Sequence, residues 1–279
     1  MNEEDEEEIE EDVPDESDWR GRGYFNCPAP PANVRLPSSP LTDPWLWWQV
    51  AFHRAKGGDF ALLPGLIEIA VEADDHFLEA ACSLLLGDAG TPGCFDAIVR
   101  ELTTTSSTEL TLNFSDALAT RGRLADVPVI LQAYTNVADI EDAAVIPSHL
   151  SDLLEPDVGA IADPSLLRSL DEYEAAVMNR YHQLVTEFGT DQVLILRRQR
   201  FGVVPMARQM LDRARRPHFP SDLQRRFSAS TGIDSAPFYR NGEFQPLTTA
   251  AIIEEFLESP GAARYEDGAR YFFGHAIPD

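Results

Sequence analysis

The sequence predicts an all-α protein built mainly from stacked helical pairs. Three glycines, Gly58, Gly90 and Gly122, lie 32 residues apart. Each is followed by a similar short segment with the apolar period of a helix, and a longer apolar helix precedes each of the two later glycines. A fixed period in this range indicates paired helices that need their neighbours to bury their inner faces.

The helix that organises this pattern is predicted over residues 74–90, DDHFLEAACSLLLGDAG. Its apolar residues recur at three- and four-residue steps, as one face of a helix requires. Asp74 and Asp75 suit the positive N-terminus of the helix, and Gly87 and Gly90 end it. Paired acids at a helix start are typical of caps, which is why we do not interpret them as an acid/base pair.

The shorter helices begin near residues 59, 91 and 123, and Pro64 and Pro128 occupy equivalent places in the first and third. A proline in the first helix, an acidic turn, and an Ala-rich second helix ending in Leu-Gly-Asp-x-Gly resemble HEAT-type repeats. The resemblance covers roughly residues 57–155 and implies a short α-solenoid. The alternative is an irregular helical bundle whose glycines align by chance.

Four regions are expected along the chain. Residues 1–42 form an N-terminal segment that is first acidic and then rich in proline, and residues 1–18 alone contain twelve Asp and Glu. Such a segment buries too little apolar surface to fold, so we predict disorder over 1–18 and irregular chain after it. The repeats follow over 43–160, a helical lobe with an Arg-rich segment over 161–232, and a tail with hairpin, helix and aromatic run over 233–279.

Within the repeats, Asp43-Pro44 opens a helix that carries Trp45, Trp48 and Phe52 on one face. Trp47 points elsewhere and is therefore a candidate anchor for a partner, since aromatic residues concentrate in interface hot spots. Packing of Trp47 beneath the proline-rich linker is the alternative.

In the lobe, we predict a long helix from residue 164 to 188 and another from Asp191, whose VLIL segment leads into the arginines. A helix over residues 139–155 is expected to be broken near Pro147, and Pro205 is expected to interrupt the helix that follows the arginines. In the tail, Asn241-Gly242 between aromatic flanks predicts a hairpin turn, and the aromatic run after Arg270 is typical of a chain that docks onto a core.

Charge is the most unusual property of the chain. The formal net charge is −25, yet residues 197–226 hold nine arginines against two aspartates. A body this acidic repels nucleic acid and anionic membranes and attracts basic protein, although acidity can also serve only solubility. We expect the arginines to pair internally with acids of the neighbouring repeats and to orient the two halves. A nucleic-acid contact through Arg197, Arg198 and Arg200 is the less favoured alternative.

Several classes of site are not indicated by the sequence. No apolar run is long enough to span a membrane, and the acidic N-terminus does not resemble a secretory signal. Three cysteines in no paired spacing favour a reducing, cytoplasmic compartment. We find no GxSxG, P-loop, GxGxxG or HExxH motif, and the six histidines are scattered, so no catalytic, cofactor-binding or metal-ligating residues are predicted.

A short, acidic, motif-free chain of helical repeats is similar to the immunity proteins of bacterial polymorphic toxin systems, and the pattern YEDGARYFFGH also resembles their endings. The resemblance implies a non-catalytic inhibitor that binds a cognate, basic toxin. On this hypothesis, Trp47 is an anchor, and the negative patch consists of Asp74, Asp75, Glu79 and Asp88. The alternatives are a HEAT-like adaptor and a repeat-containing enzyme with a pocket between repeats and lobe.

Overall fold

The computed structural model describes residues 23–30, 33–138, 141–156, 169–216 and 219–278. Over these residues the chain is mostly helical with a few short antiparallel hairpins, which confirms the predicted fold class at this level. The acidic segment 1–18 and the start of the long helix predicted from 164 lie outside the described residues.

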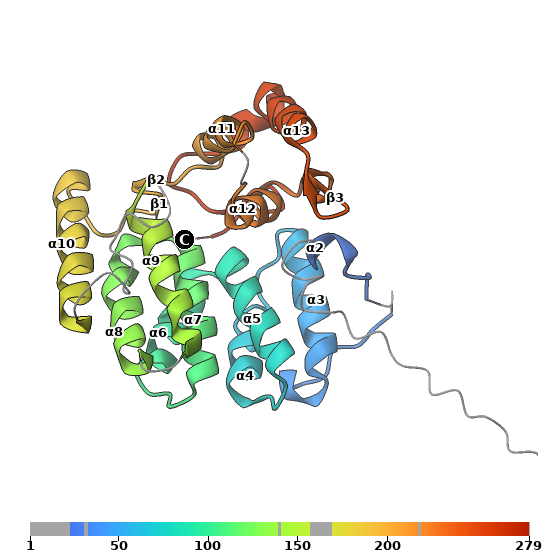
Figure 1. Cartoon of the computed structure of the whole chain (residues 1–279). Coiled ribbons are helices and arrows are strands. Elements are labelled where there is room, and N and C mark those ends of the chain that lie inside the picture. The colour runs from blue at the N-terminus through green and yellow to red at the C-terminus, as the bar shows by residue number, and fades with distance from the viewer. Residues whose placement is uncertain (1–22, 31–32, 139–140, 157–168, 217–218, 279) are drawn as a thin grey trace, which may run out of the picture.

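The first half of the chain is a row of upright helices (Figure 1). Helix α5 packs against α3, α4 and α7, and α7 packs in turn against α6, α8 and α9. The bounds of these helices are Pro44–Lys56 for α3, Gly65–Glu72 for α4, His76–Ala89 for α5, Pro92–Leu102 for α6, Thr108–Arg121 for α7, Val127–Val137 for α8 and Val145–Leu154 for α9. Short 3-10 turns lie at Pro40–Thr42 (η1), Leu124–Asp126 (η2) and Glu141–Ala144 (η3).

The glycine period marks the ends of alternate helices. Helix α3 ends at Gly57, next to Gly58, while α5 ends at Gly90 and α7 at Gly122. Gly122 has φ +78°, a left-handed conformation that favours glycine. The prolines fall at helix starts, where their missing N–H costs little. Pro64 immediately precedes α4, and Pro128 lies in the first turn of α8 rather than within the helix.

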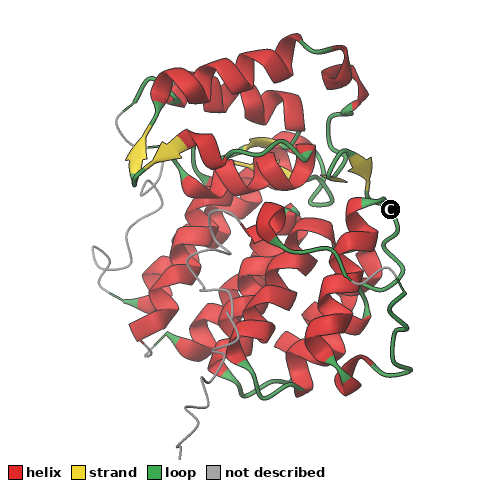
Figure 2. Cartoon of the chain, turned by 90° about the vertical axis from the view of Figure 1, so that its right-hand side faces the viewer, coloured by secondary structure: helices red, strands yellow, loops and turns green. Residues whose placement is uncertain are grey.

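Helix α10 stands upright beside α8 and α9 and continues the row, and the chain after it forms a lobe above the ends of these helices (Figures 1 and 2). In the lobe, α11 packs against α12 and α13. The bounds are Leu170–Phe188 for α10, Val203–Arg213 for α11, Ser221–Thr231 for α12 and Pro246–Glu258 for α13, with 3-10 turns at Ala236–Phe238 (η5) and Pro260–Arg264 (η6). Three hairpins pair Ile195–Leu196 (β1) with Gln199–Arg200 (β2), Tyr239–Arg240 (β3) with Glu243–Phe244 (β4), and Tyr271–Phe272 (β5) with His275–Ala276 (β6).

Two apolar cores lie in the described residues, one in the row and one in the lobe. One runs through the helical row and includes Trp48, Phe52 and Phe114, and the other fills the lobe around Met210, Phe227 and their neighbours. The aromatic tail docks as expected, because Phe272 of β5 is fully buried in the core of the row. The hairpin predicted at Asn241-Gly242 is also confirmed.

The helix predicted from Asp191 is wrong. Residues 195–200 form the β1–β2 hairpin, and its turn residues Arg197 and Arg198 have φ +50° and +64°. Two consecutive left-handed residues cannot continue a helix, and they suit a two-residue hairpin turn. The arginine pair adopts this conformation because its backbone N–H groups donate to the carbonyls of Asp152 and Leu153 at the end of α9.

Three further differences concern proline and the N-terminal segment. Pro147 and Pro205 lie in the first turns of α9 and α11, so neither interrupts a helix. The segment expected to be irregular contains a short helix, α2 (Gly23–Asn26), whose Tyr24 is buried among aromatic rings of the core. Burial of one large ring gives this polar stretch a fixed place.

Candidate functional site

Trp47 is a packing residue between two helices. Its indole N–H donates to the carbonyl of Leu62 at 3.4 Å, and its ring covers Gly65 at the start of α4. A Cβ at Gly65 would lie 2.6 Å from the indole nitrogen, so the glycine permits this close approach. The side chain is half-buried against the turn before α4.

Asp74 and Asp75 lie together at the turn between α4 and α5, as expected. One carboxylate oxygen of Asp75 caps α5 by accepting from the backbone N–H of Leu78 at 3.1 Å. Its other oxygen accepts from the indole N–H of Trp45 at 3.0 Å, which ties the turn to the start of α3. Asp75 is therefore half-buried, and Asp74 remains exposed.

Glu79 and Asp88, expected on the surface, are both buried. Glu79 is 8% exposed, and it accepts a hydrogen bond from the side-chain amide of Asn113 on α7 at 2.8 Å. Burial raises the pKa of Glu79, and the Asn113 hydrogen bond opposes this shift. Asp88 is 7% exposed and accepts from the hydroxyl of Tyr24 at 2.6 Å. Helical packing on both sides of α5 thus removes two of the four carboxylates from the surface.

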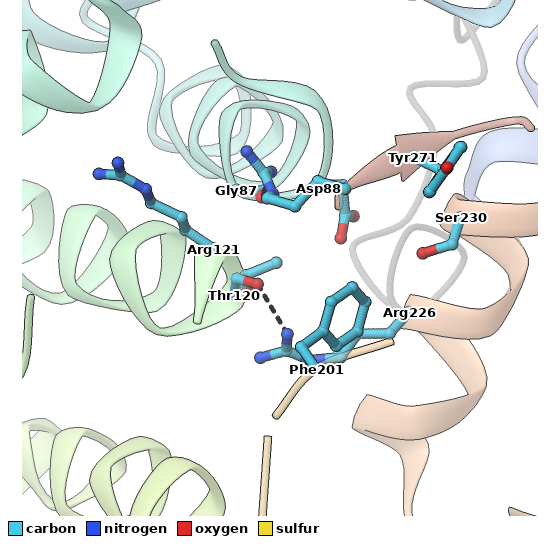
Figure 3. Close-up of a pocket in the computed structure, with 9 residues that line it drawn as sticks. Gly87, Asp88, Thr120, Arg121, Phe201, Arg226, Ser230 and Tyr271 are labelled. Atoms are coloured by element: carbon cyan, nitrogen blue, oxygen red, sulfur yellow. Dashed lines mark hydrogen bonds between the residues drawn. The ribbon is translucent and has the colours of Figure 1, made fainter. Parts of the chain in front are cut away.

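The predicted residues do not form one patch. Asp74, Asp75 and Glu79 belong to the N-terminal end of α5, whereas Asp88 lies nine residues further along, about 13 Å at the rise of an α-helix. Asp88 faces the lobe, where it lines a hollow with Arg226 and Arg270 (Figure 3).

Two arginines of the lobe, the buried Arg226 and the half-buried Arg270, bind the C-terminal ends of row helices. Arg226 of α12 donates to the carbonyl oxygens of Ala119 and Thr120 at 2.8 and 2.7 Å, at the end of α7. Arg270 donates to the carbonyl oxygens of Gly87 and Gly90 at the end of α5. The last carbonyls of a helix have no partner within it and carry partial negative charge, so guanidinium groups stabilise both ends.

Ion pairs join the same junction. Arg225 lies 3.6 Å from Asp116 of α7, and Arg197 lies 3.2 Å from Asp222 and 3.6 Å from Asp152 of α9. The expectation that the arginines pair with acids in the repeat region is therefore confirmed for Asp116 and Asp152, whereas Asp222 belongs to the Arg-rich segment itself. Arg197 is 1% exposed, which places it in the interior rather than on a surface that nucleic acid could reach.

The pKa values at the junction follow from burial and from crowding of like charges. Burial and, to a lesser extent, the neighbouring Arg121 lower the pKa of Arg270 to about 9. Burial also raises the pKa of Asp126 to about 6, although Arg121 lies 3.6 Å away. Arg121 and Arg270 both lie over the ring of Phe95, at 4.4 and 4.9 Å from its centroid.

The hollow at this junction lies where the enzyme alternative places a pocket. The space in it that water-sized molecules can occupy is about 20 Å³. Small-molecule sites commonly measure ~300–1,000 Å³, so this hollow is far too small to hold a substrate. The guanidinium groups of Arg226 and Arg270 that line it are engaged with helix carbonyls, and this arrangement serves to fasten the lobe to the row.

The arginine-rich segment can be recognised in the sequence, but the carbonyl groups that its arginines bind cannot. Arg226 reaches partners 106 and 107 residues away, and Arg270 reaches partners 180 and 183 residues away. The excess of arginine within an acidic chain was the only signal available, and Arg270 lies outside that segment. Backbone carbonyls carry no residue type, so no pattern of side chains could identify them.

In the part of the chain that the structure describes, no group of three or more His, Cys, Asp and Glu side chains is placed to hold a metal ion. No helix in the described ranges has both the length and the apolar character needed to cross a membrane. No protein-family model, curated protein or solved structure matches the chain.

Proposed function

We propose that the chain is a non-catalytic protein-binding module, an immunity-type protein that binds a cognate basic toxin and blocks its active site. The observation that carries the proposal is that the charged residues of α4 and α5 are all acidic. Residues 57–99 contain no Lys or Arg, and Glu68, Glu72 and Asp74 are exposed there. Enzymes that attack nucleic acid are basic around their active sites, and opposite charge accelerates the capture of such a partner.

The arrangement of the helices supports this proposal. We infer that α3 to α8 form HEAT-like pairs, since α3, α5 and α7 each end at the periodic glycines and each is followed by a shorter helix. Repeats of this kind present extended surfaces to other proteins. The free thiols of Cys27, Cys82 and Cys94 fit a reducing compartment such as the cytoplasm, where a toxin would have to be neutralised.

Co-expression with the protein encoded by the adjacent gene tests the proposal. We expect that protein to arrest growth when produced alone, and we expect the present chain to restore growth and to co-purify with it in a fixed ratio. A neighbour that is harmless alone and does not bind would refute the immunity function.

A HEAT-like adaptor is the second candidate, favoured by a separate apolar position on the lobe. Leu247 at the start of α13 is 87% exposed, which provides a possible contact away from the acidic helices. An adaptor should bind two proteins at once without inhibiting either. Binding assays with two partners, one of them labelled, distinguish this function from stoichiometric inhibition.

A further inference from the structure

Exposed apolar side chains gather around the turn between α4 and α5. Val71 in the last turn of α4 is 37% exposed, and Phe77 in the first turn of α5 is 38% exposed. Leu41, 39% exposed, lies in η1, which packs against α4. Large apolar side chains that are exposed and surrounded by polar residues are typical of contact surfaces between proteins. We name these three residues, together with Asp43, Glu72 and Asp74, the turn surface.

The charged residues of the turn surface are all acidic. Asp43, Glu72 and Asp74 are exposed, and no ion pair among the described residues neutralises them. The absence of Lys and Arg over residues 57–99 keeps the local field negative. Apolar side chains surrounded by carboxylates are complementary to an apolar anchor flanked by Lys or Arg.

The backbone beneath the turn surface is held in place before any partner binds. Asp75 caps α5 and accepts from Trp45, so the turn is attached both to its own helix and to α3. Leu78, the residue after Phe77, is 1% exposed and lies in the core. A surface ordered in advance loses little conformational entropy on binding, which favours affinity.

We propose that the turn surface is the docking site for a basic segment of the partner protein, in which an apolar side chain contacts Phe77 and flanking Lys or Arg residues face Glu72 and Asp74. This assignment rests on the proposed function, because it specifies which surface of the binding module meets the partner. The acidic surface repels nucleic acid and anionic membranes, so a basic polypeptide is the occupant that its charge favours.

A labelled synthetic amphipathic helix of lysine and leucine serves as the probe, and fluorescence anisotropy with the full chain measures its affinity. The double variant Glu72→Lys/Asp74→Lys should weaken binding at least about tenfold. The matched control Glu254→Lys/Glu255→Lys makes the same change of net charge at exposed positions of α13 and should weaken binding less than about twofold. Phe77→Ala should weaken binding about fivefold, and Leu247→Ala, at the more exposed leucine, should not.

Three outcomes would overturn the assignment. They are equal effects of the two charge reversals, no binding of the peptide, or a dimer of the chain that Phe77→Ala dissociates in sedimentation experiments. Binding of the adjacent gene product that Glu72→Lys/Asp74→Lys leaves unchanged would also overturn the docking site while preserving the proposed function. Conversely, the peptide could bind with the expected difference between the two charge reversals while the adjacent gene product neither arrests growth nor binds. This result would refute the toxin partner and preserve the docking site.

Discussion

Removal of the Arg226 side chain should destabilise the attachment of the lobe to the row. Arg226 is 8% exposed, and its two hydrogen bonds at 2.7 and 2.8 Å hold the carbonyls of Thr120 and Ala119. Hydrogen bonds from a charged donor contribute about 1.5–3 kcal/mol each, and lost partners leave buried carbonyls unsatisfied. The Nε of Arg226 has no hydrogen-bond partner among the described residues, which offsets part of this gain. We expect Arg226→Ala to lower the free energy of unfolding by about 3–5 kcal/mol.

Urea denaturation followed by circular dichroism measures this loss. Two further variants test whether the loss comes from the two hydrogen bonds of Arg226. Arg226→Lys keeps the charge but cannot bond two carbonyls in the same fork, so we expect an intermediate loss. Arg208→Ala removes an exposed arginine of α11 and should change stability by less than about 0.5 kcal/mol. A loss below about 1 kcal/mol for Arg226→Ala, with an unchanged denaturant slope, would refute the role assigned to these hydrogen bonds.

Three further predictions concern the backbone, the pH dependence and the N-terminal segment. Gly122→Ala should cost about 1–2 kcal/mol more than Gly189→Ala in urea denaturation, because both glycines have φ near +75°, but only at Gly122 would a Cβ approach a backbone oxygen to 2.7 Å. Equal losses of stability in the two variants would contradict this expectation, because they would show that the backbone oxygen near Gly122 can move away from the added Cβ. Burial raises the pKa of Asp126 from 3.8 to about 6, so the folded protein keeps a proton that the unfolded chain has released. The contribution of Asp126 to the free energy of unfolding should therefore fall by about 3 kcal/mol as pH rises from about 4 to 7, and Asp126→Asn should lack this component in the same titration; parallel profiles would contradict it. Tyr24→Phe should lower the free energy of unfolding by about 1–3 kcal/mol, since it leaves the buried carboxylate of Asp88 without its 2.6 Å donor, and an unchanged midpoint in thermal unfolding would contradict that expectation.

The helices of the row could be predicted because their signals are local. Apolar residues at helical spacing, caps such as Asp43 and Asp75, and glycines at a fixed period each operate within one or two turns of chain. The structure places helix ends at Gly57, Gly90 and Gly122, as this reasoning requires. The Asn241-Gly242 hairpin was predictable for the same reason, since its turn chemistry lies within the two residues themselves.

The β1–β2 hairpin could not be predicted from such signals. Arg197 and Arg198 carry no intrinsic preference for positive φ, and their conformation depends on the end of α9, more than forty residues earlier in the chain. Burial of Arg197 beside Asp152 and Asp222 is likewise a tertiary effect. Where contacts with distant parts of the chain determine the backbone conformation, the intrinsic preferences of the residues do not predict it.

The candidate site was partly predictable. The acidic character of the α4–α5 turn follows from composition, and Asp74 lies on the surface as expected. The burial of Glu79 and Asp88 depends on Asn113 and Tyr24, and neither could be paired with its acid from spacing alone. The apolar members of the turn surface, Phe77 above all, resembled core residues because exposure cannot be deduced from a helical period.

The hydrogen bond from Arg270 to Gly87 spans 183 residues, which has a consequence for a chain emerging from the ribosome. At ~5–20 residues per second, roughly 10–40 s separate the synthesis of the α5 carbonyls from that of the guanidinium group that binds them. During this interval, water or a chaperone must satisfy the open end of that helix. Nascent chains stalled before residue 270 should therefore expose a protease-sensitive edge that the finished chain protects.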